Sequence, residues 1–243
     1  MFSERVTVIV PTYQHQDYLR YSVISILNQT IPIKLIVVPV ASDVPTIQAL
    51  GHLSQILSQF DRTFTTLEAD KPDVFGQMQL GIDHVDTEYF FFLGSDDIAL
   101  PHMAEKMLSK ADDLGVANPI VGMSCAKADE TFNITSLSRA KPFKEGNMRK
   151  GSYIPDNALV KLESVQKVGA LIRSGVDWGY ANHYAMYLRL LRLEGTEVYL
   201  FPEIGWIYRE LPNSRHIQRY KTRADLRNHR KLMREVWDYY NRH

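Results

Sequence analysis

Residues 6–13 read VTVIVPTY, a continuous run of mostly β-branched residues that ends in a polar loop. Such a run is typical of a strand that is buried on both faces. Helical and apolar segments then alternate along the chain, with helices expected at 17–28, 45–60 and 74–85 and strands at 35–40, 63–67 and 89–93. This alternation predicts an α/β fold with a mostly parallel sheet flanked by helices.

Two adjacent carboxylates follow the last of these strands, in the stretch YFFFLGSDDIAL at residues 89–100. Because parallel sheets bind ligands beyond the carboxyl ends of their strands, Asp96 and Asp97 are candidate site residues, together with loops 11–13 and 41–45. A carboxylate pair can hold Mg²⁺ or Mn²⁺, and the cation removes the repulsion between the two anions. The alternative is that the pair only caps the helix that follows.

The second half of the chain has a less regular pattern. It suggests a helix at 101–114, a strand at 119–124, a polar mobile loop at 126–152, helices at 157–168 and 181–194, a strand at 198–201 and a basic, aromatic-rich helix at 219–240. No linker separates these segments from the first half. We therefore expect a single domain over 1–243, with a nucleotide-sugar part at 1–100, an irregular acceptor part at 101–218 and a basic C-terminal helix at 219–243.

Composition and charge restrict the class of protein. The single cysteine, Cys125, excludes an internal disulfide and a cysteine-built zinc site. No apolar run reaches 18 residues, so we expect no transmembrane helix and a cytoplasmic protein. Residues 1–120 carry 7 Lys and Arg against 15 Asp and Glu, a net charge of −8, and residues 121–243 carry +8. The basic half suggests an anionic partner, although a solvated helix face is the simpler explanation for the tail.

Several motifs together resemble those of the inverting family 2 glycosyltransferases with the GT-A fold. The opening strand, its PTY loop and the first helix are similar to that family's N-terminus, and FFLGSDDIALP resembles its metal-binding segment. The segments EADKPDVFGQMQLGI, YLRLLRLEG and IYRELPNSRH resemble its later motifs. The resemblance covers most of the chain, and it implies transfer of a sugar from a nucleotide-diphosphate sugar with inversion at the anomeric carbon.

The resemblance also implies roles for individual residues. Pro11, Thr12 and Tyr13 should line the nucleotide pocket, with Tyr13 packing on the base. Asp97 should ligate Mn²⁺ or Mg²⁺, and Asp96 should face the ribose or the metal. The remaining residues expected near the donor sugar and its phosphates are Asp70, Lys71 and Gln77.

The sequence departs from the family pattern at the position that reads the base. The family usually carries an Asp-Asp-Gly-Ser-like stretch after its second strand, whereas this chain reads VVPVASD at 37–43. Asp43 lies a few residues farther on and is the candidate substitute. The donor is therefore expected to be UDP- or GDP-linked without a choice between them.

A second departure affects the catalytic base. The family places an acidic residue shortly before its L-R-L segment, and His183 occupies the aligned position here. A neutral imidazole can accept a proton from an acceptor hydroxyl. Asp177, in GVDWGY, is the rival candidate. The third possibility is that neither serves and that the protein binds sugar nucleotides without transferring them.

The acceptor is open at this point. A saccharide or lipid-linked saccharide is the default that the resemblance implies. The basic C-terminal segment would also suit a nucleic acid, as in a glycosyltransferase that modifies a base, or an anionic membrane surface with peripheral binding. A nucleotidyltransferase is disfavoured because no Gly-rich, Lys- or Arg-bearing loop follows the first strand.

Overall fold

The computed structural model describes residues 4–60, 62–171, 178–211 and 223–242. The first half contains β1 (Val6–Pro11), α1 (Leu19–Leu27), β2 (Ile33–Val38), α2 (Val44–Ser58), β3 (Thr65–Thr66), α3 (Val74–Ile82), β4 (Tyr89–Phe92), β5 (Ile98–Ala99) and α4 (Met103–Leu114). The second half contains β6 (Asn118–Ala128), β7 (Ile134–Ser138), η1 (Glu145–Lys150), β8 (Leu159–Lys161), α5 (Leu162–Lys167), η2 (Gly179–Ala181), α6 (Asn182–Leu190), β9 (Thr196–Arg209) and α8 (Arg223–Arg242). In this part of the chain no helix is long and apolar enough to cross a membrane.

One sheet runs through both halves, in the order β3-β2-β1-β4-β8-β6-β9-β5, with β7 added to β6. The strands β1, β2, β3 and β4 are mutually parallel, as the alternating sequence predicts. Strand β8 is antiparallel to both of its neighbours, β4 and β6, and β5 is antiparallel to β9. The sheet is thus parallel where the donor is expected to bind and mixed beyond that point.

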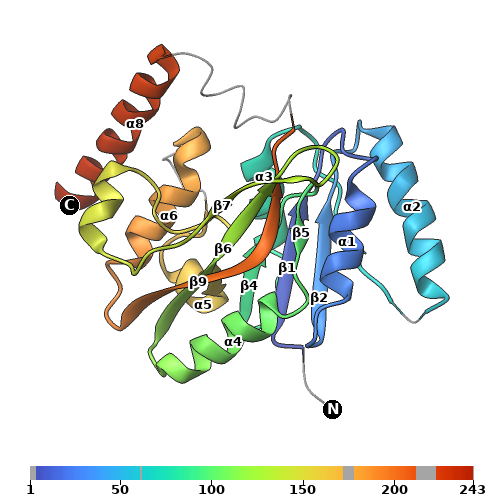
Figure 1. Ribbon diagram of the computed structural model, residues 1–243, viewed down its shortest axis with the longest axis horizontal. Coiled ribbons are helices and arrows are strands. Elements are labelled where there is room, and N and C mark those ends of the chain that lie inside the picture. Colours follow the sequence, from blue (N-terminus) through green and yellow to red (C-terminus); the bar gives the residue numbers. More distant parts are fainter. Residues whose placement is uncertain (1–3, 61, 172–177, 212–222, 243) are drawn as a thin grey trace.

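Two apolar layers cover the sheet (Figure 1). Val6, Val8 and Val10 of β1 face one layer, with the buried sides of α1, α2 and α4. Ile9 faces the other layer, with α3, α5, α6 and α8. Because successive strand residues point to opposite faces, this double burial explains why β1 has no polar alternation.

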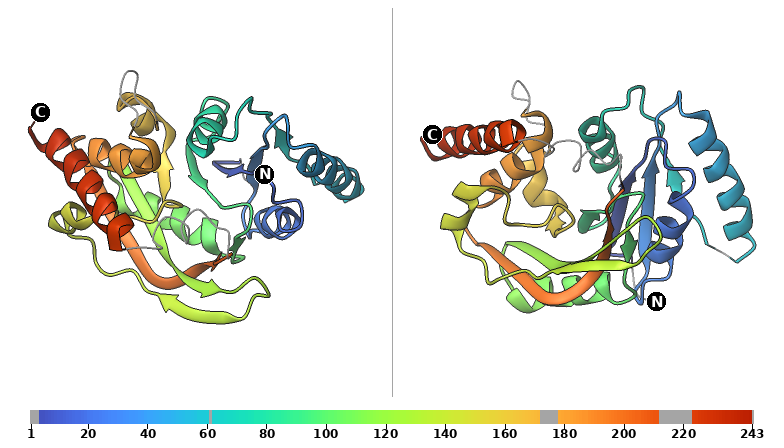
Figure 2. Two further views of the ribbon diagram at one scale, coloured as in Figure 1. Left: turned by 90° about the horizontal axis from the view of Figure 1, so that it is seen from above. Right: turned by 45° about the horizontal axis from the view of Figure 1, so that its top comes forward.

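The far side of the sheet curls strongly, and Figure 2 shows β9 bent across the bottom of the molecule. Its pairing with β6 shifts register twice, between Met123 and Ser124 and between Ser124 and Cys125. Such bulges bend a strand and increase its twist. The bend carries the end of β9 back to β5, where Ile207 pairs with Ile98 next to the carboxylate pair.

Two expectations for the second half are wrong. Segment 126–152 is not one loop, since β6 extends to Ala128 and β7 and η1 both form within it. The expected helix 157–168 begins as β8, because its first residues fill the gap between β4 and β6. The expected strand 198–201 is confirmed, and it lies near the start of β9, which is fourteen residues long.

Candidate active site

The carboxyl ends of β1, β2 and β4 lie side by side because β1 pairs with both of the others. The Thr12 N–H donates to the carbonyl of Val38 at 3.0 Å, which joins the loop after β1 to the end of β2. Thr12 is buried beside Pro11, and Tyr13 is half-buried on the same loop. The predicted loops 11–13 and 41–45 are therefore neighbours in the fold.

Asp43 and Gln77 connect these loops. The Asp43 carboxylate accepts from the Gln14 N–H at 2.5 Å and from the Thr46 N–H at 3.4 Å, which caps α2. The Gln77 amide donates to the carbonyls of Thr12, at 2.9 Å, and Val38, at 2.6 Å. Both side chains are buried, so their polar groups hold the loops, and contact with a donor stays a prediction for each.

Asp70 and Lys71 lie on the loop before α3, and both are exposed. The loop is held against the end of β2 by the Ala41 N–H, which donates to the carbonyl of Ala69 at 2.8 Å. Neither side chain has an ion pair within the described residues. Both are thus available to a ligand at this edge of the sheet.

The carboxylate pair follows β4 on a tight turn. Asp97 is only 5% exposed, and its Oδ1 accepts from the Arg209 backbone N–H at 3.0 Å. The pair does not cap the next helix, because α4 starts after His102 and has no side-chain cap. The capping alternative is therefore wrong.

Gly94 makes the approach of the two carboxylates possible. A Cβ at this position would lie 2.6 Å from Asp97 Oδ2 and 2.9 Å from Asp96 Oδ1. Real Cβ atoms almost never make contacts this short. Both side chains therefore fold back over the same glycine, which brings an oxygen of each to one spot.

Burial raises the pKa of Asp97 well above its usual range, and the negative charge of Asp96 adds to the effect. Burial also raises the pKa of Asp96, while His15 and Arg209 act in the opposite direction. Two poorly solvated anions side by side are costly unless a cation joins them. A hard divalent cation fits this donor set chemically, since Mg²⁺ commonly takes one or two carboxylates and completes its shell with phosphate oxygens and water.

Further metal ligands beside the carboxylate pair are not found among the residues that the structure describes. Within the described ranges no group of three or more His, Cys, Asp and Glu side chains is placed to hold a metal. The segment 212–222, which contains His216 of the IYRELPNSRH motif, lies outside the described residues. Any cation at the pair would thus rely on Asp96 and Asp97 together with ligand oxygens.

Arg209, at the end of β9, is a site residue that the sequence analysis quoted within a motif but gave no role. Its side chain is 1% exposed, and its guanidinium carbon lies 3.6 Å from the ring centroid of Phe132 and 4.6 Å from that of Tyr18. Nε and Nη2 have no hydrogen-bond acceptor among the described residues. Burial lowers its pKa, and the charges of Asp96 and Asp97 oppose that shift. The rings of Tyr18 and Phe132 thus hold the Arg209 guanidinium close to the carboxylate pair.

His183 lies near the same end of the sheet. Its ring contacts Phe92, the last residue of β4, with centroids 5.0 Å apart, and Phe75 of α3, at 5.6 Å. The side chain is buried, Nδ1 is 3.6 Å from Asp156 Oδ1, and Nε2 has no partner in the described part of the chain. A distance of 3.6 Å is too long for a hydrogen bond, but it brings a carboxylate, unforeseen from sequence, beside the ring. Asp177 lies outside the described residues.

Comparisons with known proteins agree with this fold. Residues 7–169 match the family described as glycosyl transferase family 2. The glycosyltransferase GlyA of Streptococcus pneumoniae is 30% identical over 97 residues, which are 40% of this chain and 14% of GlyA. The chain thus spans a small part of that curated relative's length.

Two solved structures share the fold. S. aureus TarS 1–349 in complex with UDP-GlcNAc gives a TM-score of 0.66 at 14% identity, over 96% of this chain and 65% of that one. The mannosyltransferase PcManGT from Pyrobaculum calidifontis, in complex with GDP-Man and Mn²⁺, gives 0.62 at 14% identity, over 97% and 70%. A longer S. aureus TarS chain is covered over only 37% of its length. The family match spans more than half of this chain, and both neighbours, one of them a mannosyltransferase, share its architecture. The chain belongs to glycosyl transferase family 2 and has the GT-A fold.

Proposed function

We propose that this protein transfers a sugar from a nucleotide-diphosphate sugar to an acceptor hydroxyl, with inversion and with a divalent cation. The observation that carries the proposal is the pair of half-buried Asp96 and buried Asp97, whose carboxylates both lie over Gly94 at the carboxyl end of β4 and do not cap the helix that follows. The same single domain would bind the donor with residues 1–100 and the acceptor with residues 101–218.

Asp96 and Asp97 would hold Mn²⁺ or Mg²⁺, which supplies charge neutralisation for the diphosphate that leaves. The protein's own contribution is to fix the pair. The Arg209 N–H orients one oxygen of Asp97, and the buried guanidinium lies close enough to offset part of the negative charge. The anions are thus positioned before any ligand arrives, which is the condition for electrostatic stabilisation without reorganisation.

The donor base would pack on Tyr13, with Thr12 beside it. Thr12 Oγ1 is buried and has no hydrogen-bond partner in the described part of the chain, which leaves this hydroxyl for the nucleotide. TarS and PcManGT were solved with UDP-GlcNAc and with GDP-Man. We therefore expect a UDP- or GDP-linked sugar, with Asp70 and Lys71 facing the sugar and its phosphates.

The acceptor hydroxyl needs a base, and His183 is the candidate that lies in the described residues. Nδ1 lies on the side of Asp156, and in the neutral tautomer that carries its hydrogen on Nδ1, the other nitrogen can accept a proton. That nitrogen, Nε2, has no partner among the described residues. The ring is covered by Phe75 and Phe92, so the acceptor must reach it past these side chains. Asp177 remains the rival, and a protein that binds sugar nucleotides without transfer remains the outcome if neither serves.

A thermal-shift screen of UDP, GDP and their sugars, with and without Mn²⁺, tests the donor site. A ligand that binds only the folded state raises the melting temperature of the protein. A ligand present at a hundred times its Kd stabilises the folded state by about 2.7 kcal/mol. We expect a shift with one nucleotide that requires Mn²⁺ and is absent from Asp97→Ala. An equal shift in Asp97→Ala would remove the central role of the carboxylates.

Donor turnover then tests the reaction. We expect His183→Gln to lower kcat with little change in the nucleotide-induced thermal shift, because glutamine keeps the volume but cannot take up the proton. If His183→Gln is fully active and Asp177→Asn is not, the base is Asp177. Donor binding with no turnover under any condition would support the non-catalytic alternative.

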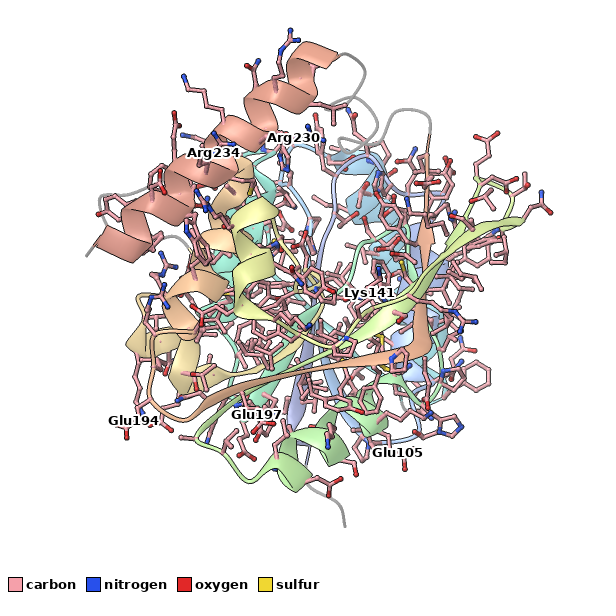
Figure 3. All side chains as sticks on the ribbon, turned by 60° about the vertical axis from the view of Figure 1, so that its left-hand side comes forward. Glu105, Lys141, Glu194, Glu197, Arg230 and Arg234 are labelled. Atoms are coloured by element: carbon pink, nitrogen blue, oxygen red, sulfur yellow. The ribbon has the colours of Figure 1, made fainter. Side chains whose placement is uncertain are left out.

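The acceptor has a second possible class, which one observation favours. Helix α8 exposes Arg227, Arg230, Lys231 and Arg234 along one side, with Lys231 Nζ 3.8 Å from Glu235 Oε1, and Figure 3 shows Arg230 and Arg234 on this helix. A basic helix face of this kind suits an anionic polymer or membrane surface. Retention on DNA or on anionic vesicles at low salt, lost in a variant with all four changed to Gln, distinguishes this class from a neutral saccharide.

A further inference from the structure

A cavity lies apart from the carboxylate pair, among β6, the end of β7, β9 and the segment 152–155 that follows η1. Its volume is about 390 Å³, within the range of small-molecule sites. Its polar and aromatic walls come from Arg139, Lys141, Tyr153 and Trp206. Figure 3 shows Lys141 on the segment between β7 and η1.

The cavity is basic. Arg139 and Lys141 both line it, and no Asp or Glu does. Neither cation has an ion pair or hydrogen bond within the described residues. Lys127, on the neighbouring strand, differs because its Nζ is paired with Glu210 at 2.7 Å. Two unpaired cations at one cavity without a carboxylate favour an anionic ligand.

The cavity also offers a ring-sized apolar surface. Trp206 lines it, and the indole nitrogen is covered and has no acceptor among the described residues, so the rest of this half-buried side chain is its exposed part. Tyr153, Ser138 and Ser152 also line the cavity, and the Ser152 hydroxyl donates to the Ile154 carbonyl at 2.9 Å. The apolar face of a sugar ring packs on an indole, while its hydroxyls need polar partners. Aromatic walls with a few polar groups thus suit a sugar better than a simple inorganic anion.

The cavity is connected to the carboxylate pair through β9. Trp206 and Tyr208 are two residues apart, so their side chains lie on one face of the strand, and their ring centroids are 5.6 Å apart. Arg209 follows directly, and its N–H donates to Asp97. Trp206 precedes Arg209 by three residues, so about 10 Å of strand separates their backbones, which places the cavity along the same strand as the group that holds Asp97.

We propose that this cavity is the acceptor subsite and that it takes a sugar bearing a carboxylate or a phosphate, with Trp206 under the sugar ring and Arg139 and Lys141 on the anion. The assignment to an acceptor rests on the proposed transfer reaction. The assignment to an anionic sugar rests only on the cavity.

The chain contains three tryptophans, so a ¹H–¹⁵N spectrum shows few indole signals, and Trp206→Phe identifies the one in the cavity. The probes are glucuronic acid, glucose 6-phosphate, glucose and inorganic phosphate. We expect the Trp206 signal to shift saturably with at least one anionic sugar and to respond little to glucose or phosphate at equal concentration. A response to glucuronic acid alone identifies a carboxylate ligand, and one to glucose 6-phosphate alone identifies a phosphate.

Charge variants test the recognition. We expect Arg139→Ala and Lys141→Ala each to weaken binding about tenfold, which is the ~1.4 kcal/mol of one charge-assisted contact. Lys144→Ala, which removes an exposed lysine outside the cavity, should bind as the wild type does. Equal binding of glucose and the anionic sugars, or the same loss in Lys144→Ala, would overturn the anionic assignment.

The closing measurement separates this inference from the reaction. The sugar that shifts Trp206 should also accelerate nucleotide release from the donor, and Lys141→Ala should raise the sugar concentration needed. If no probe shifts Trp206 while nucleotide and Mn²⁺ still raise the melting temperature, the cavity assignment is wrong and the donor site stands. If an anionic sugar shifts Trp206 but no nucleotide binds, the acceptor role is wrong and the transfer reaction falls with it.

Discussion

Gly94→Ala adds one methyl group between the two carboxylates and removes no charge. The new Cβ would lie 2.6 Å from Asp97 Oδ2 and 2.9 Å from Asp96 Oδ1, while ordinary contact begins at 3.4 Å. The oxygens must therefore move by about 0.8 and about 0.5 Å. Carboxylate ends can move, so we expect the protein to fold, but the atoms that move are those that would bind the cation. Sites tolerate misplacements of about 0.5 Å, and about 1 Å can cost a hundredfold in rate.

We therefore expect kcat/KM for nucleotide release to fall between about tenfold and a hundredfold, equivalent to about 1.4–2.7 kcal/mol. The Mn²⁺ concentration for half-maximal rate should rise, while the melting temperature without metal changes by only a few degrees. The matched control is Gly51→Ala on α2, where an added Cβ meets nothing within 4 Å. Wild-type kcat/KM and Mn²⁺ dependence in Gly94→Ala would refute the convergence of the two carboxylates on one ion.

Three further changes test packing and charge. Gly81→Ala places a Cβ 2.5 Å from the buried side chain of Ile9. Overpacking costs ~1–3 kcal/mol, so Gly81→Ala should melt at a lower temperature than Gly51→Ala, by about 2–4 °C per kcal/mol. Equal melting temperatures would contradict the packing of α3 on β1. Phe132→Ala keeps the Cβ at the positive φ of 66° and removes the ring stacked on Arg209, so thermal melts should show a loss of about 1–2 kcal/mol, and an unchanged melting temperature would mean that the stacking contributes nothing. Burial raises the pKa of Asp97 in the folded state, so the stability of the metal-free protein should fall as pH rises above about 4, the pKa of Asp in the unfolded chain. Asp97→Asn should weaken this pH dependence and abolish stabilisation by Mn²⁺. Parallel curves of stability against pH for the two proteins would contradict the buried charge.

The first hundred residues could be predicted well because burial on both faces leaves a continuous apolar run in each central strand. Strand β4 is buried throughout, and it shows this pattern directly. The helices between such strands each bury one side, so their spacing is also visible. The site loops follow from topology alone, because the ends of neighbouring parallel strands must meet.

Strands β7 and β8 of the second half were not predicted, for physical reasons. All five residues of β7 are exposed, so pairing with β6 leaves no hydrophobic pattern in its sequence. Strand β8 is three residues long, and the helix α5 follows it without a loop, so the sequence pattern predicted one helix over both. The position of β8 inside the sheet depends on pairing with β4 and β6, which are distant in sequence, and local patterns do not reveal such pairing.

The charged residues of the candidate site could be predicted from the sequence, but the groups that position them could not. Asp96 and Asp97 could be identified because two adjacent acidic residues directly after a buried strand are unusual. The N–H group that orients Asp97 belongs to the backbone of Arg209, 112 residues away, and a backbone donor has no signature in sequence. The nearness of Asp156 to His183 is hidden for the same reason, since the two come together only through the fold.

These supports make the donor site depend on the acceptor half. The N–H that holds Asp97 lies at the end of β9, and the Arg209 side chain is packed between Tyr18 at the start of α1 and Phe132 of the β6–β7 turn. An isolated fragment of residues 1–100 would lack that N–H and the adjacent guanidinium. Its two carboxylates would repel each other without either group to offset their charge. The curl of the sheet, which brings the end of β9 to β5, is therefore what supplies both groups to the carboxylate pair.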